Sequence, residues 1–481
     1  MAAPHTHKPD HAAAWSRRQW MLRANTPVAC WLIILPLTVG AAAAGHMNSW
    51  IPDHILGIGV ITTSIMVWSQ YFTARFTGHR PTRAHQVRQL YRIWTVTVGT
   101  VLILGGQLPD TPSTYVSVMG ATLTTAGMVL HGISLGKQYL ESDKTRRFRP
   151  IVAVYVLATI CLLGGITAGI LLTIGVPGAW PNRLRSAHLI LNLPGFVGLT
   201  AFGSLTLMFP AVWRTRGRPD HTSAAATALV CGVSVAVSGT LCGTPGVLGT
   251  GLLIYAAGWI IAAVPWMGNV RDVLTDPRDR LTFAAVAVVA APAWLIIGIL
   301  RAAVEVFLGS TVAFTLPVLP LLIGFGAQLL IGVLSFLVPS IIGGGPAAVR
   351  RGMGVLDSLG LLRATLLNGS LALRQFESAT SIGPAPALLI ALSLGAFLPL
   401  TATAVVLQRQ RLQRAHDPGT PATATGRHNP AYGQIVTGLV ILGILIIVAL
   451  SRSQGISGGI PGAPDASHAR TTDVALQSSP L

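Results

Sequence analysis

Hydrophobic residues in this chain fall into long runs, and short polar stretches rich in arginine, glycine and proline separate them. Most runs approach the roughly 20 residues that a helix needs to cross a bilayer. We therefore predict thirteen membrane-spanning helices. In chain order the runs cover residues 27–45, 51–74, 92–108, 114–135, 151–175, 186–213, 223–241, 246–267, 281–307, 312–343, 359–375, 384–407 and 432–451.

The run at 359–375 is the weakest of the thirteen, because it is short and holds Arg363, Asn368 and Arg374. Basic residues near membrane helices concentrate on the inner side. If the N-terminus is inside and this run crosses, most of the 33 Lys and Arg residues lie on that side. If it does not cross, the basic connection at 408–431 moves outside. The charge pattern therefore favours a crossing.

Composition supports this architecture. The chain of 481 residues is 51% hydrophobic and 10% charged, with a mean hydropathy of +0.62, whereas soluble domains average about 25% charged residues. The net charge of +18 does not indicate a nucleic-acid partner, because the basic residues lie in connections where they set topology and meet anionic lipid. We predict an all-α, polytopic helix bundle in the cell (plasma) membrane, with the lipid bilayer as its partner.

The segments outside the runs are polar. We predict a cytoplasmic tail at 1–26, a cytoplasmic basic loop at 408–431 and a disordered external tail at 452–481, rich in Gly, Pro and Ser. The first run has no clear cleavage site, so we expect it to stay as an anchor. The four cysteines are scattered without C-x-x-C spacing, which argues against a disulfide or zinc framework and predicts buried apolar thiols.

Several ionisable groups are predicted at one depth near the outer surface. His54 lies near the outer end of the second run, and His188 lies near the outer end of the sixth. Asn192 follows His188 by one helical turn, on the same face. At membrane depth such groups are costly without a partner, ligand or water. The loops add His46 before the second run and, before the sixth, the basic pair Arg183 and Arg185.

Two functional interpretations of this outer group remain open. Facing imidazoles could hold haem iron or copper, with Arg183, Arg185 or Arg301 neutralising haem propionates. Alternatively, the arginines could attract an anion such as nitrite into a polar vestibule. A purely structural interpretation also stands, in which the histidines are interfacial and Arg301 pairs with Glu305 one turn later.

Two further polar positions lie deeper in the predicted bundle. His131 lies toward the inner end of the fourth run and could form an inner site with Trp68, Gln70 and Tyr71, although such aromatic residues also anchor helices at the interface. Gln328 lies in the middle of the tenth run, where a buried amide often bonds to a neighbouring helix.

Three runs together resemble a known family. They are WIPDHILGIGVITTSIMVWSQYF from residue 50, SAHLILNLPGFVGLTAFGSLTLMFPAVWRTR from residue 186 and GFGAQLLIGVLSFLVPSIIGGGP from residue 324. They are similar to actinobacterial membrane proteins whose bundle resembles subunit I of haem–copper oxidases. The resemblance covers most of residues 27–451 and implies a twelve-helix oxidase-like core plus one helix. Some relatives carry an external cupredoxin-type copper nitrite reductase or multicopper oxidase domain beyond the last helix. This sequence ends at Leu481, so we expect any such enzyme to be an external partner.

The resemblance carries over only part of the oxidase ligand set. His54 stands where that superfamily has a low-spin haem ligand, and His188 stands where it has one copper ligand. The histidine pair expected in the seventh run is missing, and no histidine occurs between His221 and His416. A complete haem–copper reaction centre, and with it oxygen reduction, is therefore excluded. A single haem, a lone copper or a scaffold without metal remains.

These observations predict a haem- or copper-binding module for redox or nitrogen-oxide chemistry. His54, His188 and His46 are the candidate metal ligands, and His54, His188, Asn192, Arg183, Arg185 and His131 are the candidate cofactor-binding residues. A small-solute or anion transporter and a membrane scaffold for an external copper enzyme are the alternatives.

Overall fold

The computed structural model describes residues 13–108, 112–218, 221–309, 316–375, 383–414 and 428–457. Every regular element within these ranges is a helix. In chain order they are α1 (Arg17–Ala24), α2 (Thr26–Ala43), α3 (Trp50–His54), η1 (Ile55–Thr62), α4 (Thr63–Thr77), α5 (Arg83–Gly105), α6 (Thr114–Glu141), α7 (Arg149–Ile174), α8 (Trp180–Ile190), η2 (Leu191–Gly198), α9 (Leu199–Trp213), α10 (Thr222–Cys242), α11 (Pro245–Leu274), α12 (Phe283–Phe307), η3 (Leu319–Ala327), α13 (Gln328–Ile342), α14 (Gly345–Leu356), α15 (Gly360–Arg374), α16 (Ala385–Gly395), α17 (Phe397–Arg414) and α18 (Tyr432–Ser457).

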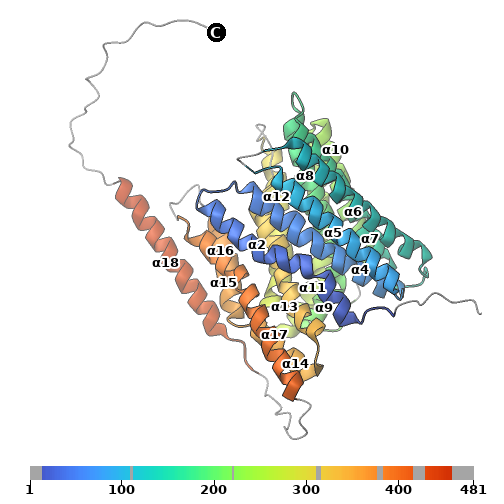
Figure 1. Cartoon of the computed structure of the whole chain (residues 1–481). Helices are drawn as coiled ribbons and strands as arrows, with labels where there is room; N and C mark the ends of the chain where they lie inside the picture. The colour runs from blue at the N-terminus through green and yellow to red at the C-terminus, as the bar shows by residue number, and fades with distance from the viewer. Residues whose placement is uncertain are drawn as a thin grey trace, which may run out of the picture.

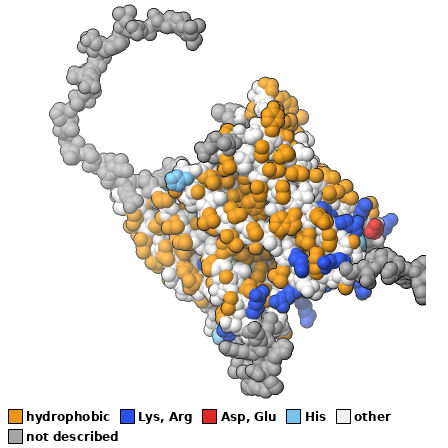
Figure 2. All heavy atoms as spheres, in the orientation of Figure 1, with side chains coloured by type: hydrophobic (Ala, Val, Ile, Leu, Met, Phe, Trp, Pro, Cys, Tyr) orange, Lys and Arg blue, Asp and Glu red, His pale blue; other side chains and the backbone are white. Residues whose placement is uncertain are grey.

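The all-α membrane bundle is confirmed. Eleven helical stretches in the described ranges are long and apolar enough to cross a bilayer, and each coincides with a predicted run. The other two predicted spans are α5, whose first turns are polar, and α15, which has 15 residues. Hydrophobic side chains cover the face shown in Figure 2, and Lys and Arg gather along one edge of it. Such a surface belongs in a lipid bilayer.

The short helix α15 passes through the bundle beside α12. At one end the Phe283 backbone N–H donates to Asp357 Oδ1 over 2.6 Å, and at the other Arg301 donates to Gln375 Oε1 over 2.8 Å. These two contacts are about 27 Å apart along α12 at the helical rise of 1.5 Å per residue. The helix α15 therefore runs parallel to α12 over much of its length, which supports the crossing predicted for the run at 359–375.

Connections predicted to share the inner side do meet at one end of the bundle. The Asp279 N–H donates to the His428 carbonyl over 3.1 Å, and the His428 N–H donates to Asp279 Oδ1 over 3.0 Å. This joins the connection after α11 to the residues before α18. In Figure 1, α18 lies at the edge of the bundle beside α15.

Three spans form the centre of the bundle, and each contains a π-helical segment. The segments η1, η2 and η3 lie in the second, sixth and tenth predicted spans, which are the three runs that carry the family resemblance. In each of these three spans 72% of the most apolar 18-residue stretch is buried, against 17–56% in the other candidate spans. The segment η3 contacts both η1 and η2. π-Helical turns are rare and occur frequently at functional sites.

Local chemistry accounts for the break in the sixth span. Pro194 lies inside η2 and has no backbone N–H, so it cannot continue the α-helical bonding. The Tyr255 hydroxyl, which comes from α11, donates to the Pro194 carbonyl over 2.7 Å. Because that carbonyl is buried at membrane depth, its bond to a neighbouring helix stabilises the irregular backbone.

Some predicted segments differ in length from the helices that form, and others lie outside the described ranges. The N-terminal tail forms α1, whose start is fixed by a bond of 2.8 Å from the Trp15 N–H to Gln86 Oε1, while residues 1–12 lie outside. Most of the basic loop (415–427) and of the external tail (458–481) also lies outside, and α18 runs on to Ser457. The prediction of buried cysteines is wrong for Cys30, Cys231 and Cys242, which are exposed on helix surfaces. Lipid chains are as apolar as a protein core, so a thiol can face them without a partner.

Candidate functional site

The structure brings His54 and His188 together. Their ring centroids are 6.3 Å apart, and the ring planes differ by 26°. His54 is the residue directly before η1, and His188 lies three residues before η2. Both imidazoles therefore lie at the N-terminal ends of π-helical segments in two central spans, on the predicted outer side. The predicted meeting of the second and sixth spans at one depth is thus present in the fold.

The ring of His54 is fixed on two sides. It stacks on Trp50 with the centroids 3.7 Å apart and the planes at 22°, and its Nδ1 lies 2.8 Å from the Trp50 carbonyl oxygen. A carbonyl accepts hydrogen bonds only, so Nδ1 must carry the proton. The neutral imidazole then presents Nε2 as a lone-pair donor. Metal-binding histidines usually show this arrangement, in which the other nitrogen is held by a backbone carbonyl.

His188 is held in the same way by a different helix. Its Nδ1 donates to the Gly165 carbonyl of α7 over 2.8 Å, and Asn192 Nδ2 lies 3.2 Å from its Nε2. Asn192 Oδ1 is buried and has no partner. An unpartnered buried carbonyl oxygen costs about 1–3 kcal/mol. The oxygen of this amide, whose nitrogen lies against His188, is therefore a further position that a cation or a hydrogen-bond donor would satisfy.

The donor set is small. No group of three or more His, Cys, Asp or Glu side chains that could hold a metal is found in the described parts of the chain. Two imidazole nitrogens and one amide oxygen suit an ion that accepts few ligands. Imidazole binds zinc, copper, iron and nickel well, whereas carboxylate-rich sites suit magnesium and calcium. A metal held by this pair would therefore be a transition metal.

Arg183 and Arg185, the predicted basic residues, form no hydrogen bond with His54 or His188 in the described structure. Arg183 donates to the Leu241 carbonyl over 3.1 Å and lies over the Trp180 ring, which attaches α8 to the end of α10. Arg185 is exposed, and so is His46, which lies in the loop between α2 and α3.

His131 belongs to a separate inner group. Its Nε2 lies 3.0 Å from Ser69 Oγ, and its Nδ1 is buried without a partner. Ser69 follows His54 by 15 helical residues, or about 22 Å along the span. Gln70, predicted beside His131, accepts a bond of 3.1 Å from Ser134. The structure thus places His131 in the inner half of the bundle, away from the outer pair.

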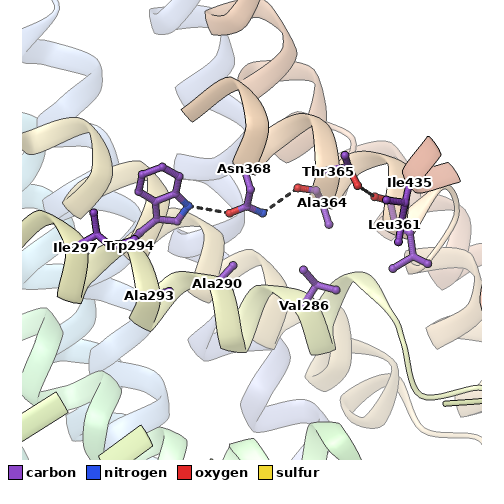
Figure 3. Close-up of a pocket in the computed structure, with 10 residues that line it drawn as sticks. All are labelled: Val286, Ala290, Ala293, Trp294, Ile297, Leu361, Ala364, Thr365, Asn368 and Ile435. Carbon is purple, nitrogen blue, oxygen red and sulfur yellow. Dashed lines mark hydrogen bonds between the residues drawn. The ribbon is translucent and has the colours of Figure 1, made fainter. Parts of the chain in front are cut away.

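A polar contact joins α12, α13 and α15, and the sequence alone did not predict that its members meet. Trp294 donates to Asn368 Oδ1 over 2.7 Å, and Gln328 Nε2 donates to the same oxygen over 3.2 Å. Figure 3 shows Trp294 and Asn368 lining a cavity of about 380 Å³ beside Ile435 of α18. The sequence signal was two amides in separate apolar runs. Gln328 therefore bonds to a neighbouring helix, as its sequence position suggests.

Comparison with protein-family models finds no match for this chain, and comparison with curated proteins finds none either.

Proposed function

We propose that this integral membrane protein binds a single copper ion between His54 and His188 and serves redox or copper-handling chemistry at the outer face of the membrane. The observation that carries the proposal is the close approach of the two rings, 6.3 Å between centroids. Each ring has its Nδ1 against a backbone carbonyl, so Nε2 is the lone-pair nitrogen of each ring, and that of His188 accepts a hydrogen bond from Asn192 Nδ2.

Copper fits these residues better than haem. The Nε2 of His188 already has the Asn192 amide beside it, and the ring of His54 is covered by Trp50. Neither histidine lines the cavity of about 380 Å³ or the cavity of about 350 Å³. Arg183, expected to neutralise a haem propionate, is bonded to α10 instead. A single ion needs only the space between the two nitrogens and the amide.

When bound, copper would supply one-electron transfer or would itself be the cargo. The protein's own contribution would be to hold the two imidazoles neutral and oriented and to surround them with apolar helices. Two neutral nitrogen ligands in such a shell favour the lower-charged cuprous state, since the environment around a site tunes its redox potential. Asn192 would turn its amide oxygen toward the ion as the His188 nitrogen exchanges its hydrogen bond for a metal bond.

The resemblance to haem–copper oxidase subunit I is part of this proposal. It assigns His54 and His188 to two different centres, whereas this chain lacks the remaining ligands of both and has the two rings close together. An external cupredoxin-type copper protein is the partner that the resemblance implies. The predicted outer position of the site would allow electrons or copper to pass between them.

Metal analysis of the purified protein tests the proposal. We expect one copper per chain after loading with Cu(I), with nitrogen donors in the X-ray absorption spectrum. The His54→Ala and His188→Ala variants should each lose most of this copper. The matched controls are His46→Ala, an exposed histidine on the same side, and His131→Ala in the inner half.

Equal copper binding by the wild type and the two outer-histidine variants would overturn the copper assignment. A Soret band that disappears in both variants would assign haem instead. The transporter alternative has less support, because two polar residues of the bundle that could line a path are bonded to other side chains. Arg301 bonds to Glu305 and Gln375, and Gln328 bonds to Asn368.

A further inference from the structure

A second cavity lies at the opposite end of the sixth span from the histidine pair. It has a volume of about 350 Å³ and lies among the residues just before α7, the start of α10, one side of α9 from Phe202 onward and the later half of α11. These helix ends are on the predicted inner side of the membrane. The proposed copper site does not involve any of its residues.

The deep wall of this cavity is apolar. Phe202 and Pro210 of α9 are about 12 Å apart along the helix, and both line the cavity together with Trp266 of α11. The Trp266 ring stacks on Phe209 with the centroids 5.2 Å apart and the planes at 12°. The wall therefore extends from the inner surface toward the middle of the bilayer and suits a hydrocarbon chain.

The mouth of the cavity is polar and carries positive charge. Arg218 lies against Gly268, because a β-carbon added at Gly268 would be only 2.9 Å from Arg218 Nε. Arg218 also donates to Asp272 over 2.5 Å. That contact leaves further N–H donors on the guanidinium. His221 and the first residue of α10 also line the mouth, and the N-terminal end of a helix favours an anion.

One lining side chain is buried with an unsatisfied acceptor. Asn269 is 2% exposed, and its Oδ1 has no hydrogen-bond partner. The hydroxyl of Thr215, another lining residue, is also buried without a partner. An amide oxygen accepts only, so a ligand that satisfies it must bring an O–H or N–H group. The cavity thus combines an apolar wall, a guanidinium at the mouth and an acceptor for a hydroxyl.

We propose that this cavity binds a glycerophosphate group: the phosphate lies against Arg218, a headgroup hydroxyl donates to Asn269, and an acyl chain follows the wall formed by Phe202 and Trp266. Basic pockets between membrane helices on the cytoplasmic side are suited to anionic headgroups. The same polar chemistry is found in an inner-leaflet phosphatidylglycerol and in free glycerol phosphate, and the acyl chain distinguishes the two.

Lipid retention in native mass spectrometry tests this proposal on the full chain. The protein is reconstituted in phosphatidylcholine vesicles containing phosphatidylglycerol or phosphatidylmethanol, which has the same charge but no headgroup hydroxyl. We expect about tenfold preference for phosphatidylglycerol, the size of one hydrogen bond to a buried acceptor. Asn269→Leu should remove that preference, and Arg218→Gln should reduce retention of both lipids. Arg271→Gln, an exposed arginine on α11 that does not line the cavity, is the matched control and should change neither.

Equal retention of the two anionic lipids by the wild type would overturn the assignment of Asn269. Equal losses in Arg218→Gln and Arg271→Gln would show general electrostatic attraction and overturn the site. Displacement of phosphatidylglycerol by free glycerol phosphate at similar concentration would assign the soluble molecule as the occupant. Failure of displacement would assign the lipid.

Discussion

Gly165 and Asn192 are packed so closely that a β-carbon on Gly165 would overlap Asn192 Oδ1. The Gly165 carbonyl also accepts the Nδ1 proton of His188. One glycine of α7 therefore makes room for the amide and orients the neighbouring imidazole.

We predict that Gly165→Ala weakens copper binding by about 10–100-fold, the usual cost of losing a group that orients a metal ligand. The added methyl group would displace Asn192 and tilt His188. Competition with a Cu(I) chelator measures the affinity. Gly164→Ala is the matched control, because its β-carbon would meet the flexible Leu191 side chain at 3.2 Å. If both variants kept wild-type affinity, the amide and the α7 carbonyl would not shape the site.

Tyr255→Phe should destabilise the sixth span. It removes the hydroxyl that satisfies the Pro194 carbonyl in η2, and a buried carbonyl left without a partner costs about 1–3 kcal/mol. The free energy of unfolding in detergent measures the loss. Tyr155→Phe is the comparison, since its partner Ser204 is a hydroxyl that can rotate to another acceptor. Equal effects of the two variants would contradict a special role for the Pro194 contact.

The stability of the inner end should depend on pH through Asp357, which lies between α14 and α15. Burial raises the pKa of Asp357 from its ordinary value of 3.8 to about 6, against the opposing effects of the Phe283 N–H and Arg363. The folded protein therefore binds this proton more tightly than the unfolded chain does. The stabilisation that this bound proton gives the folded protein is fully present below about pH 4 and is lost as the pH rises through 6.

Asp357→Asn keeps an oxygen for the Phe283 N–H and removes the ionisation. We predict that this variant is more stable than the wild type at pH 8, by on the order of 2 kcal/mol, and that its stability declines less between pH 4 and 6. Thermal unfolding at several pH values measures both. A variant less stable than the wild type at pH 8 would show that the carboxylate charge is needed beside Arg363.

Cysteine labelling tests the crossing of α15. In a background without the four native cysteines, Ser358→Cys precedes α15 and Gln375→Cys follows it. We predict that a membrane-impermeant thiol reagent added outside intact cells labels position 375, while position 358 reacts only after permeabilisation. Labelling of both positions from outside would contradict the crossing and the predicted inner side.

Much of the fold was predictable because helix formation in a bilayer depends on local composition. Without water to bond, the backbone of each apolar run must form its own hydrogen bonds. All thirteen predicted runs coincide with helices, and the difficult run at 359–375 forms α15 beside α12. The helices α6 and α11 extend past their apolar runs to Glu141 and Leu274, because polar turns can continue a helix into the interface.

The site was predictable only in part. His54, His188 and Asn192 stood out as rare polar groups in apolar runs. Their partners did not, because the Trp50 and Gly165 carbonyls belong to residues without a chemical signature. The π-helical turns were also hidden, since apolar sequence there reads as ordinary helix. Sequence placed Arg183 on the outer side but could not show that it bonds to the Leu241 carbonyl at the end of α10.

By itself the sequence determined that this protein is a multi-pass helix bundle, where its spans lie and which few polar groups the bilayer contains, because hydrophobicity and charge act on each segment separately. Only the tertiary structure decided which of those groups meet. His54 meets His188, and Gln328 pairs with Asn368, because of how helices far apart in the chain pack and how each helix is rotated about its own axis.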